Sequence, residues 1–125
     1  MILGIGCDII EIERIRNAVL KEGFCRRVFT EAEQEYCQGR GAQGAASFAA
    51  RFAAKEAVLK ALGTGLRGGS LTEIEVVQDA LGKPGIRLAG YHLELANSKG
   101  VRNIQLSLSH SKENSIAYVV MEGEE

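Results

Sequence analysis

The sequence has no tryptophan, a single proline among its 125 residues, and no long apolar run. A helix that spans a bilayer needs about 20 consecutive, mostly apolar residues, so we expect neither a membrane-spanning segment nor a membrane partner. The first residues, MILGIGCDIIEIERIR, carry no basic stretch ahead of their apolar run, which is not the pattern of a secretory signal. These absences predict a cytoplasmic protein.

Cysteine and net charge are also scarce. The three cysteines, Cys7, Cys25 and Cys37, form no CxxC pair, so neither a disulfide framework nor a zinc site is expected. We expect Cys7 to fill the core, because free cysteine is often buried. The net charge of −1 gives no sign of a nucleic-acid partner.

The length and the 46% of apolar residues suit one domain over residues 1–125. Periodicity predicts strands at 2–8, 73–78, 85–88, 104–109 and 116–121, and helices at 10–21, from 30 onward, 45–62 and 91–98. Thr30 and Glu33 form a predicted capping box, and Gly63 is a predicted left-handed cap of the long helix. Helices packed on a small antiparallel or mixed sheet place the chain in the α+β class.

The long helix carries the charged residues of greatest interest. Arg51 and Lys55 are four residues apart and lie on one face, whereas Glu56 and Lys60 are four apart on an adjacent face. The alanines between them would let a ligand or another backbone come close. The alternative is an ordinary solvated helix with a Glu–Lys pair worth about 0.3–0.5 kcal/mol.

Asp8 comes at the end of the first predicted strand. A buried carboxylate is costly unless a cation or a hydrogen-bond donor compensates it. Asp is also a favoured N-cap residue, so Asp8 could cap the helix that follows. Together, Asp8 and Glu56 offer two carboxylates from separate elements, which suits Mg²⁺, with Mn²⁺ as a substitute.

A histidine stands near the C-terminus in the segment Ser107-Leu108-Ser109-His110-Ser111. A histidine between hydroxyl residues at a strand end can donate a hydrogen bond to a phosphate. The other interpretation is a turn residue whose hydrogen bonds are satisfied locally.

Four segments, taken together, resemble the holo-[acyl-carrier-protein] synthase family of phosphopantetheinyl transferases. They are GIGCDIIEIERI at 4–15, RFAAKEAVLKALGTG at 51–65, GKP at 82–84 and SLSHS at 107–111. The segments follow the order of the family and span nearly the whole chain, and the second is long and specific. The family often has threonine where this chain has Ser111, a change that keeps the hydroxyl group.

The resemblance implies a role for each candidate residue. Asp8 and Glu56 would bind the metal and take part in catalysis with Lys60, which would lie near the coenzyme A diphosphate. The residues implied in coenzyme A binding are Arg51, Lys55, Lys60, Gly63, Thr64, Gly65, Lys83, Pro84, His110 and Ser111. His110 and Ser111 would come from a neighbouring subunit, because members of the family are homotrimers with sites at subunit interfaces.

The implied reaction transfers the 4′-phosphopantetheine group of coenzyme A to a serine of apo-acyl-carrier protein and supports fatty acid biosynthesis. The serine proton would leave to a metal-organised water or to a nearby carboxylate. Carrier proteins of this kind are acidic, so Arg14, Lys21, Arg26 and Arg27 are candidates for docking, the alternative being ordinary surface charge. The competing hypothesis is a non-catalytic coenzyme A- or carrier-binding module of the same fold, against which the intact acid pair argues.

Overall fold

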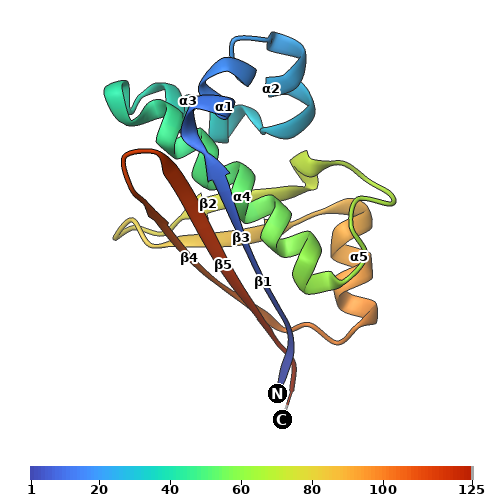
Figure 1. Cartoon of the computed structure of the whole chain (residues 1–125). Helices are drawn as coiled ribbons and strands as arrows, with labels where there is room; N and C mark the ends of the chain where they lie inside the picture. The colour runs from blue at the N-terminus through green and yellow to red at the C-terminus, as the bar shows by residue number, and fades with distance from the viewer. Residues whose placement is uncertain (125) are drawn as a thin grey trace.

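A long helix packs on one side of a small antiparallel sheet and a separate hairpin lies beside it, which confirms the predicted α+β class (Figure 1). The computed structural model describes residues 1–124. In chain order the elements are β1 (Ile2–Glu11), α1 (Ile12–Ala18), α2 (Glu22–Val28), α3 (Glu31–Gln38), η1 (Gly41–Gln43), α4 (Gly44–Leu62), η2 (Leu71–Glu73), β2 (Ile74–Gln78), β3 (Pro84–Leu88), α5 (Gly90–Ser98), β4 (Asn103–His110) and β5 (Asn114–Glu122). The sheet has the strand order β1-β5-β4, and β2 and β3 form the hairpin.

The long helix α4 is the centre of the fold. It packs on β1 and β5 and also contacts β2, α1 and α3, so it is buried around most of its circumference. Ala49, Ala53, Ala54 and Ala57 have no exposed surface, and their small side chains let neighbouring backbones come close. The helix ends at Gly63, whose φ of 79° provides the left-handed cap that the sequence predicts.

Two glycines let β1 lie directly against α4. A Cβ atom on Gly4 would fall 2.2 Å from the carbonyl oxygen of Ala61, and one on Gly6 would fall 2.0 Å from that of Ala57. Because Gly4 meets the later helical residue, the strand runs antiparallel to the helix. Each step of two strand residues then corresponds to about one helical turn.

Replacing Gly6 with alanine is expected to destabilise the fold by about 1–3 kcal/mol, the usual cost of overpacking a core. The added methyl group meets helix backbone rather than a flexible side chain, so β1 must move away from α4. Gly85→Ala in β3 is the matched control, because a Cβ at Gly85 meets nothing within 4 Å. Thermal unfolding compares the two variants, and equal melting temperatures would contradict the close approach of strand and helix.

The N-terminal region differs from the predicted boundaries. Strand β1 continues past Asp8, because its pairing with β5 extends as far as Glu11. The helix predicted over 10–21 is therefore shorter, and a turn over 19–21 separates α1 from α2, which the sequence did not indicate. The N-cap residue of α1 is Glu11, so the alternative that Asp8 caps this helix is wrong.

The remaining predicted elements are confirmed, with small shifts at their ends. The capping box at the start of α3 is present: the Thr30 hydroxyl accepts a hydrogen bond from the Glu33 N–H, and the Glu33 carboxylate accepts one from the Thr30 N–H at 2.9 Å. Within residues 1–124, no helix is both long and apolar enough to cross a membrane.

The sheet face that points away from α4 is apolar and exposed. Side chains alternate along β1, so Ile5, Cys7 and Ile9 lie opposite Asp8 and the two glycines. Ile5 is 63% exposed, Ile9 61%, and Tyr118, which pairs with Cys7 from β5, 54%. Cys7 is also exposed, so the prediction that it fills the core is wrong. We refer to Ile5, Cys7, Ile9 and Tyr118 as the outer apolar face.

Candidate active site

Asp8 and Glu56 lie together where β1 crosses α4. Asp8 is on the helix side of the strand, one step of two residues beyond the contact between Gly6 and Ala57. In an antiparallel arrangement the corresponding helical turn contains residues 53–56, which places Glu56 beside Asp8. The structure therefore brings the two predicted acidic residues to one place.

Lys60 follows Glu56 by one helical turn and reaches back to the strand. Its Nζ donates to the Asp8 carboxylate at 3.1 Å and to the carbonyl oxygen of Cys7 at 3.0 Å. The hydrogen bond with Asp8, together with the charge of Asp8, raises the pKa of Lys60. The Lys60 side chain is 56% exposed, so its ammonium group can turn toward a ligand in solvent without leaving the carboxylates.

The electrostatics of Glu56 favour a cation. Burial is the main reason that the pKa of Glu56 is raised, and the negative charge of Asp8 raises it further. The positive charges of Lys60 and Arg14 act in the opposite direction. Two neighbouring carboxylates that oppose each other's ionisation form a site that bound positive charge stabilises.

The acid pair offers only oxygen ligands. Among residues 1–124 there is no group of three or more His, Cys, Asp or Glu side chains placed to hold a metal ion. Two carboxylates suit Mg²⁺, which keeps several waters and binds phosphate oxygens in place of further protein ligands. They do not suit zinc, which prefers closed sets of nitrogen and sulfur ligands.

Lys55 does not lie at this site. Its side chain is fully buried, and its Nζ donates to the Glu33 carboxylate at 2.8 Å and to the carbonyl oxygens of Leu71 at 2.9 Å and Ile74 at 2.6 Å. Glu33 also accepts a hydrogen bond from the Val76 N–H at 2.8 Å. All three donors of Lys55, which was predicted to contact coenzyme A, are used inside the protein in this arrangement.

Arg51 lies on another side of α4, next to α3. Its guanidinium stacks on the Tyr36 ring, 4.2 Å from the ring centre, and Arg40 lies over the same ring at 5.6 Å. Arg51 is 4% exposed and its Nε has no hydrogen-bond partner. No carboxylate in the described part of the chain forms an ion pair with it. Arg51 and Glu56 are five positions apart, which is not a whole number of helical turns, so their side chains point in different directions.

His110 and Ser111 lie at the end of β4, away from the acid pair of the same chain. Strand β5 separates β4 from β1, so His110 lies about 10 Å from β1 across the sheet. Leu108 is level with Asp8 in the register of the strands, and His110 lies two residues further along β4. His110 is exposed, with its Nδ1 3.3 Å from the carbonyl oxygen of Ser111. Both residues line a hollow together with Arg16 and the start of α4.

The two segments predicted to contact the nucleotide lie at opposite ends of the β2–β3 hairpin. The glycine-rich turn at 63–65 follows α4, and the chain then enters β2 where Ile74 pairs with Leu88. Lys83 and Pro84 lie at the other end, beside the hairpin turn. A five-residue strand is about 13 Å long, so one chain does not bring these segments together.

The four basic residues predicted for docking are all exposed. Arg14 lies on α1, Lys21 is the N-cap of α2, and Arg26 and Arg27 lie in the last turn of α2. Leu20, 81% exposed, lies in the turn between these helices. The region therefore combines positive charge with an exposed apolar side chain.

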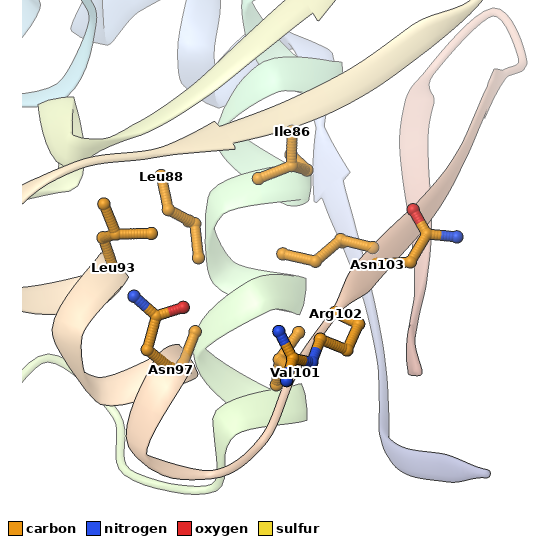
Figure 2. A pocket seen from close by; sticks show the side chains of 9 residues that line it. Ile86, Leu88, Leu93, Asn97, Val101, Arg102 and Asn103 are labelled. Carbon is orange, nitrogen blue, oxygen red and sulfur yellow. The ribbon is translucent and has the colours of Figure 1, made fainter. Parts of the chain in front are cut away.

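A cavity of about 260 Å³ lies elsewhere, between α5 and strands β3 and β4 (Figure 2). Its walls include Ile86 and Leu88 from β3 and Leu93 from α5, with Asn97 and Arg102 near them. None of the predicted site residues lines this cavity.

The sequence did not reveal the full roles of the two glycines in β1 and of Glu33. Gly4 and Gly6 allow the close contact that brings Asp8 to the helix. Glu33 was expected only to cap α3, whereas it also neutralises the buried Lys55. The sequence does contain one signal for the role of the glycines: Gly4, Gly6 and Asp8 are spaced two residues apart, which puts all three on one face of a strand.

Comparison with known proteins identifies the family of the chain. Residues 4–119 match the family model described as the 4′-phosphopantetheinyl transferase superfamily, and the chain belongs to this superfamily.

Within the superfamily, the chain is similar to proteins named holo-[acyl-carrier-protein] synthase. The one from Clostridium tetani is 50% identical over 125 residues, covering 99% of this chain and 98% of the relative. The crystal structure of the Neisseria meningitidis synthase matches with a TM-score of 0.86 and 38% identity, covering 98% of this chain and 99% of the other. The Bacillus anthracis synthase, solved in complex with CoA (3′,5′-ADP), matches with a TM-score of 0.81 and 40% identity over 99% of both chains.

Proposed function

We propose that this chain transfers the 4′-phosphopantetheine group of coenzyme A to a serine of apo-acyl-carrier protein. The products are holo-acyl-carrier protein, which serves fatty acid biosynthesis in the cytoplasm, and adenosine 3′,5′-bisphosphate. The observation that carries the proposal is the cluster of Asp8, Glu56 and Lys60 at the contact of β1 with α4. A binding module without activity has no need of two adjacent carboxylates, whose mutual repulsion opposes ionisation.

Asp8 and Glu56 would together hold one Mg²⁺ ion, with Mn²⁺ as a substitute. The residues fit such an ion, because both are oxygen ligands and because burial and the charge of Asp8 raise the pKa of Glu56. The bound cation would stabilise the negative charge that develops on the diphosphate oxygens as the leaving group departs.

Lys60 would supply a second positive charge. Its ammonium group is held by the Asp8 carboxylate but is more than half exposed, so it can reach a diphosphate bound next to the acid pair. There it would stabilise the charge that accumulates on the leaving oxygens. Through its hydrogen bond with Asp8, Lys60 also orients that carboxylate.

Arg51, His110 and Ser111 would complete the site of a neighbouring chain. The fold holds all three away from the acid pair of their own chain. Arg51 is a buried cation that stacks on Tyr36 and donates to the Ser47 carbonyl oxygen at 3.4 Å, and no carboxylate in the described part of the chain neutralises its charge. We propose a homotrimer in which each site combines Asp8 and Glu56 of one chain with His110 of the next.

The outer apolar face supports an assembly of several copies. It places Ile5, Ile9 and Tyr118 in water on one side of a three-stranded sheet, and exposed apolar patches of this kind commonly mark interfaces. The face belongs to the same sheet as Asp8 and His110, whose side chains lie on its opposite, helix-facing side. The partner that we assign to this face is a second copy of the chain.

Replacing Ile5 with glutamate is expected to break the trimer and to lower transfer activity at least about tenfold, because a charge in an apolar interface is costly. Leu81→Glu is the matched control, since Leu81 is 95% exposed at the hairpin turn and lies outside the outer apolar face. Light scattering gives the mass of each variant. A monomeric mass for the unmodified chain at assay concentration would contradict the trimer.

Mixing two inactive variants tests whether the site is shared. Glu56→Ala chains and His110→Ala chains, co-expressed, would form mixed trimers in which some sites contain both intact residues. We expect activity to return in the mixture. If the two variants stay inactive together while each forms trimers, His110 does not act across a subunit interface.

The basic surface around α1 and α2 would dock the acidic carrier. Arg14, Lys21, Arg26 and Arg27 provide positive charge, and Leu20, exposed in the turn between α1 and α2, provides an apolar contact. Arg14 also lowers the pKa of Glu56, against burial and Asp8, so this surface borders the acid pair. A carrier docked here would present its serine next to Asp8 and Glu56.

Mass spectrometry of the carrier tests the proposed function. Apo-carrier incubated with the enzyme, coenzyme A and Mg²⁺ is expected to gain the mass of one phosphopantetheinyl group, and a chelator is expected to prevent the gain. A chain that binds coenzyme A but never changes the mass of a carrier would be a binding module instead.

A further inference from the structure

The far end of the loop over residues 63–70 lies against two polar side chains outside the proposed catalytic cluster, one of them fully buried. His92 of α5 is completely buried, and neither of its ring nitrogens has a hydrogen-bond partner within residues 1–124. Glu73 has a buried carboxylate oxygen, Oε1, that is also without a partner, and this oxygen lies 3.9 Å from Nε2 of His92. Unpaired buried polar groups are uncommon in folded proteins and each requires an explanation.

Two glycines leave room for the Glu73 carboxylate. Gly69 in the loop and Gly90 at the start of α5 both have positive φ, at 66° and 55°. A Cβ atom on Gly69 would lie 2.3 Å from Oε1 of Glu73, and one on Gly90 would lie 2.6 Å from Oε2. The carboxylate is thus clamped between the loop and α5, so its position and that of the loop depend on each other.

The first turn of α5 also touches the loop directly. The Tyr91 ring lies against Gly68, where a Cβ atom would be 2.9 Å from the ring, and packs edge-to-face on His92. The Ala89 N–H donates to the carbonyl oxygen of Glu73 at 2.9 Å. Loop, η2 and the start of α5 therefore form one packed unit.

The other end of the loop begins at the proposed site. The Gly63 N–H donates to the carbonyl oxygen of Lys60 at 3.1 Å, so the loop follows directly from the helical turn that carries the proposed phosphate-binding lysine. Between its two ends the loop presents the Thr64 hydroxyl and the exposed Arg67 guanidinium, which both suit a phosphorylated ligand.

The distance between His92 and Glu73 is slightly too long for a hydrogen bond. An N–H···O bond spans about 2.7–3.2 Å, so an approach of about 1 Å would satisfy both unpaired atoms at once. Because Glu73 is clamped against Gly69, such an approach moves the loop. Any ligand that stabilises the moved loop would gain the energy of the new hydrogen bond.

We propose that His92 and Glu73 are positioning residues for coenzyme A: their hydrogen bond forms when the loop over 63–70 closes on the nucleotide. The inference rests on the proposed function, which puts the nucleotide of coenzyme A at this loop. Neither residue touches the reacting atoms. They set the affinity for the nucleotide, whereas Asp8, Glu56 and Lys60 act on the diphosphate.

Nitrogen-15 NMR of the histidine rings in the full-length protein tests the closure. The chain has only two histidines, and His92→Gln identifies the signals of His92. In the free protein burial lowers the pKa of His92, and the charge of the facing Glu73 carboxylate opposes this effect. Saturation with adenosine 3′,5′-bisphosphate is expected to raise the pKa of His92, because the closer carboxylate stabilises the imidazolium. An unchanged titration of His92 in the bound protein would overturn the proposal.

His92→Phe separates positioning from a purely structural role. Phenylalanine keeps a ring in the buried position and removes the unpaired nitrogens, so the free protein should unfold at the same or a higher temperature. We expect it to bind adenosine 3′,5′-bisphosphate at least about fivefold more weakly by calorimetry, with a matching rise in KM for coenzyme A and a kcat within about twofold. His92→Gln, which keeps a donor, should recover part of the affinity.

The outcomes distinguish the two proposals. If the unmodified chain neither binds the bisphosphate nor modifies a carrier, the proposed function fails and the inference fails with it. If the unmodified chain does both and His92→Phe binds equally well, only the positioning role is overturned. Should His92→Phe not fold, the NMR titration of the unmodified protein decides.

Discussion

Replacing Glu56 with alanine is expected to lower kcat for phosphopantetheine transfer by about 10³-fold while the chain stays folded. Glu56 would be one of two carboxylates that hold the cation, and Asp8 alone, already bonded to Lys60, would be a poor site. The measurement is the initial rate at which carrier mass changes, with Mg²⁺ in excess. A rate close to that of the unmodified chain would remove Glu56 from the metal site.

The stability of Glu56→Gln provides the control for this experiment. Burial and Asp8 raise the pKa of Glu56 in the folded chain, so the folded state prefers the protonated acid. The ionised form therefore costs stability at neutral pH: this cost is absent below the unfolded pKa, grows as pH rises toward the folded pKa, and is constant above it. Without metal, Glu56→Gln should be more stable at neutral pH by up to about 1 kcal/mol, reduced by solvent screening, and should be inactive.

Replacing Lys55 with methionine is expected to destabilise the fold by about 3–5 kcal/mol. The change leaves the Glu33 carboxylate buried and charged without its ion-pair partner, and frees two backbone carbonyls that accept from Lys55 at 2.9 and 2.6 Å. Burial lowers the pKa of Lys55, and the charge of Glu33 opposes that effect. Urea unfolding measures the loss.

Two further variants test the cause of this loss. Lys60→Met removes a half-exposed lysine from the same helix and should cost less than about 1 kcal/mol. Glu33→Gln/Lys55→Met removes both buried charges and should be more stable than Lys55→Met alone. A Lys55→Met variant as stable as Lys60→Met would show that the buried pair does not hold α3, α4 and β2 together.

The sequence predicted most elements because their signals are local. The capping box of Thr30 and Glu33 and the cap at Gly63 depend on a few adjacent residues, and both are present. The first helix was misplaced because Asp8 was taken to end β1, whereas pairing with β5, more than 100 residues away in the chain, extends the strand to Glu11. Long-range pairing of this kind leaves no local pattern.

The candidate site, too, could be predicted from the sequence only in part. Spacing on α4 could show that Lys55 and Glu56 point in different directions, but not which of the two faces would be buried. The structure decides this through β2 and α3, which enclose Lys55 and leave Glu56 beside Asp8. A periodicity argument cannot find the Glu33 partner of Lys55, because that contact joins two helices.

Binding of Mn²⁺ to the chain, followed by electron paramagnetic resonance, tests most directly whether Asp8 and Glu56 form the metal site. The protein would be saturated with adenosine 3′,5′-bisphosphate and titrated with Mn²⁺, alongside Asp8→Asn and Glu56→Ala. We predict one tightly bound ion per unmodified chain and its loss in both variants, with melting temperatures showing that each remains folded. Equal binding of Mn²⁺ by all three proteins would contradict the account.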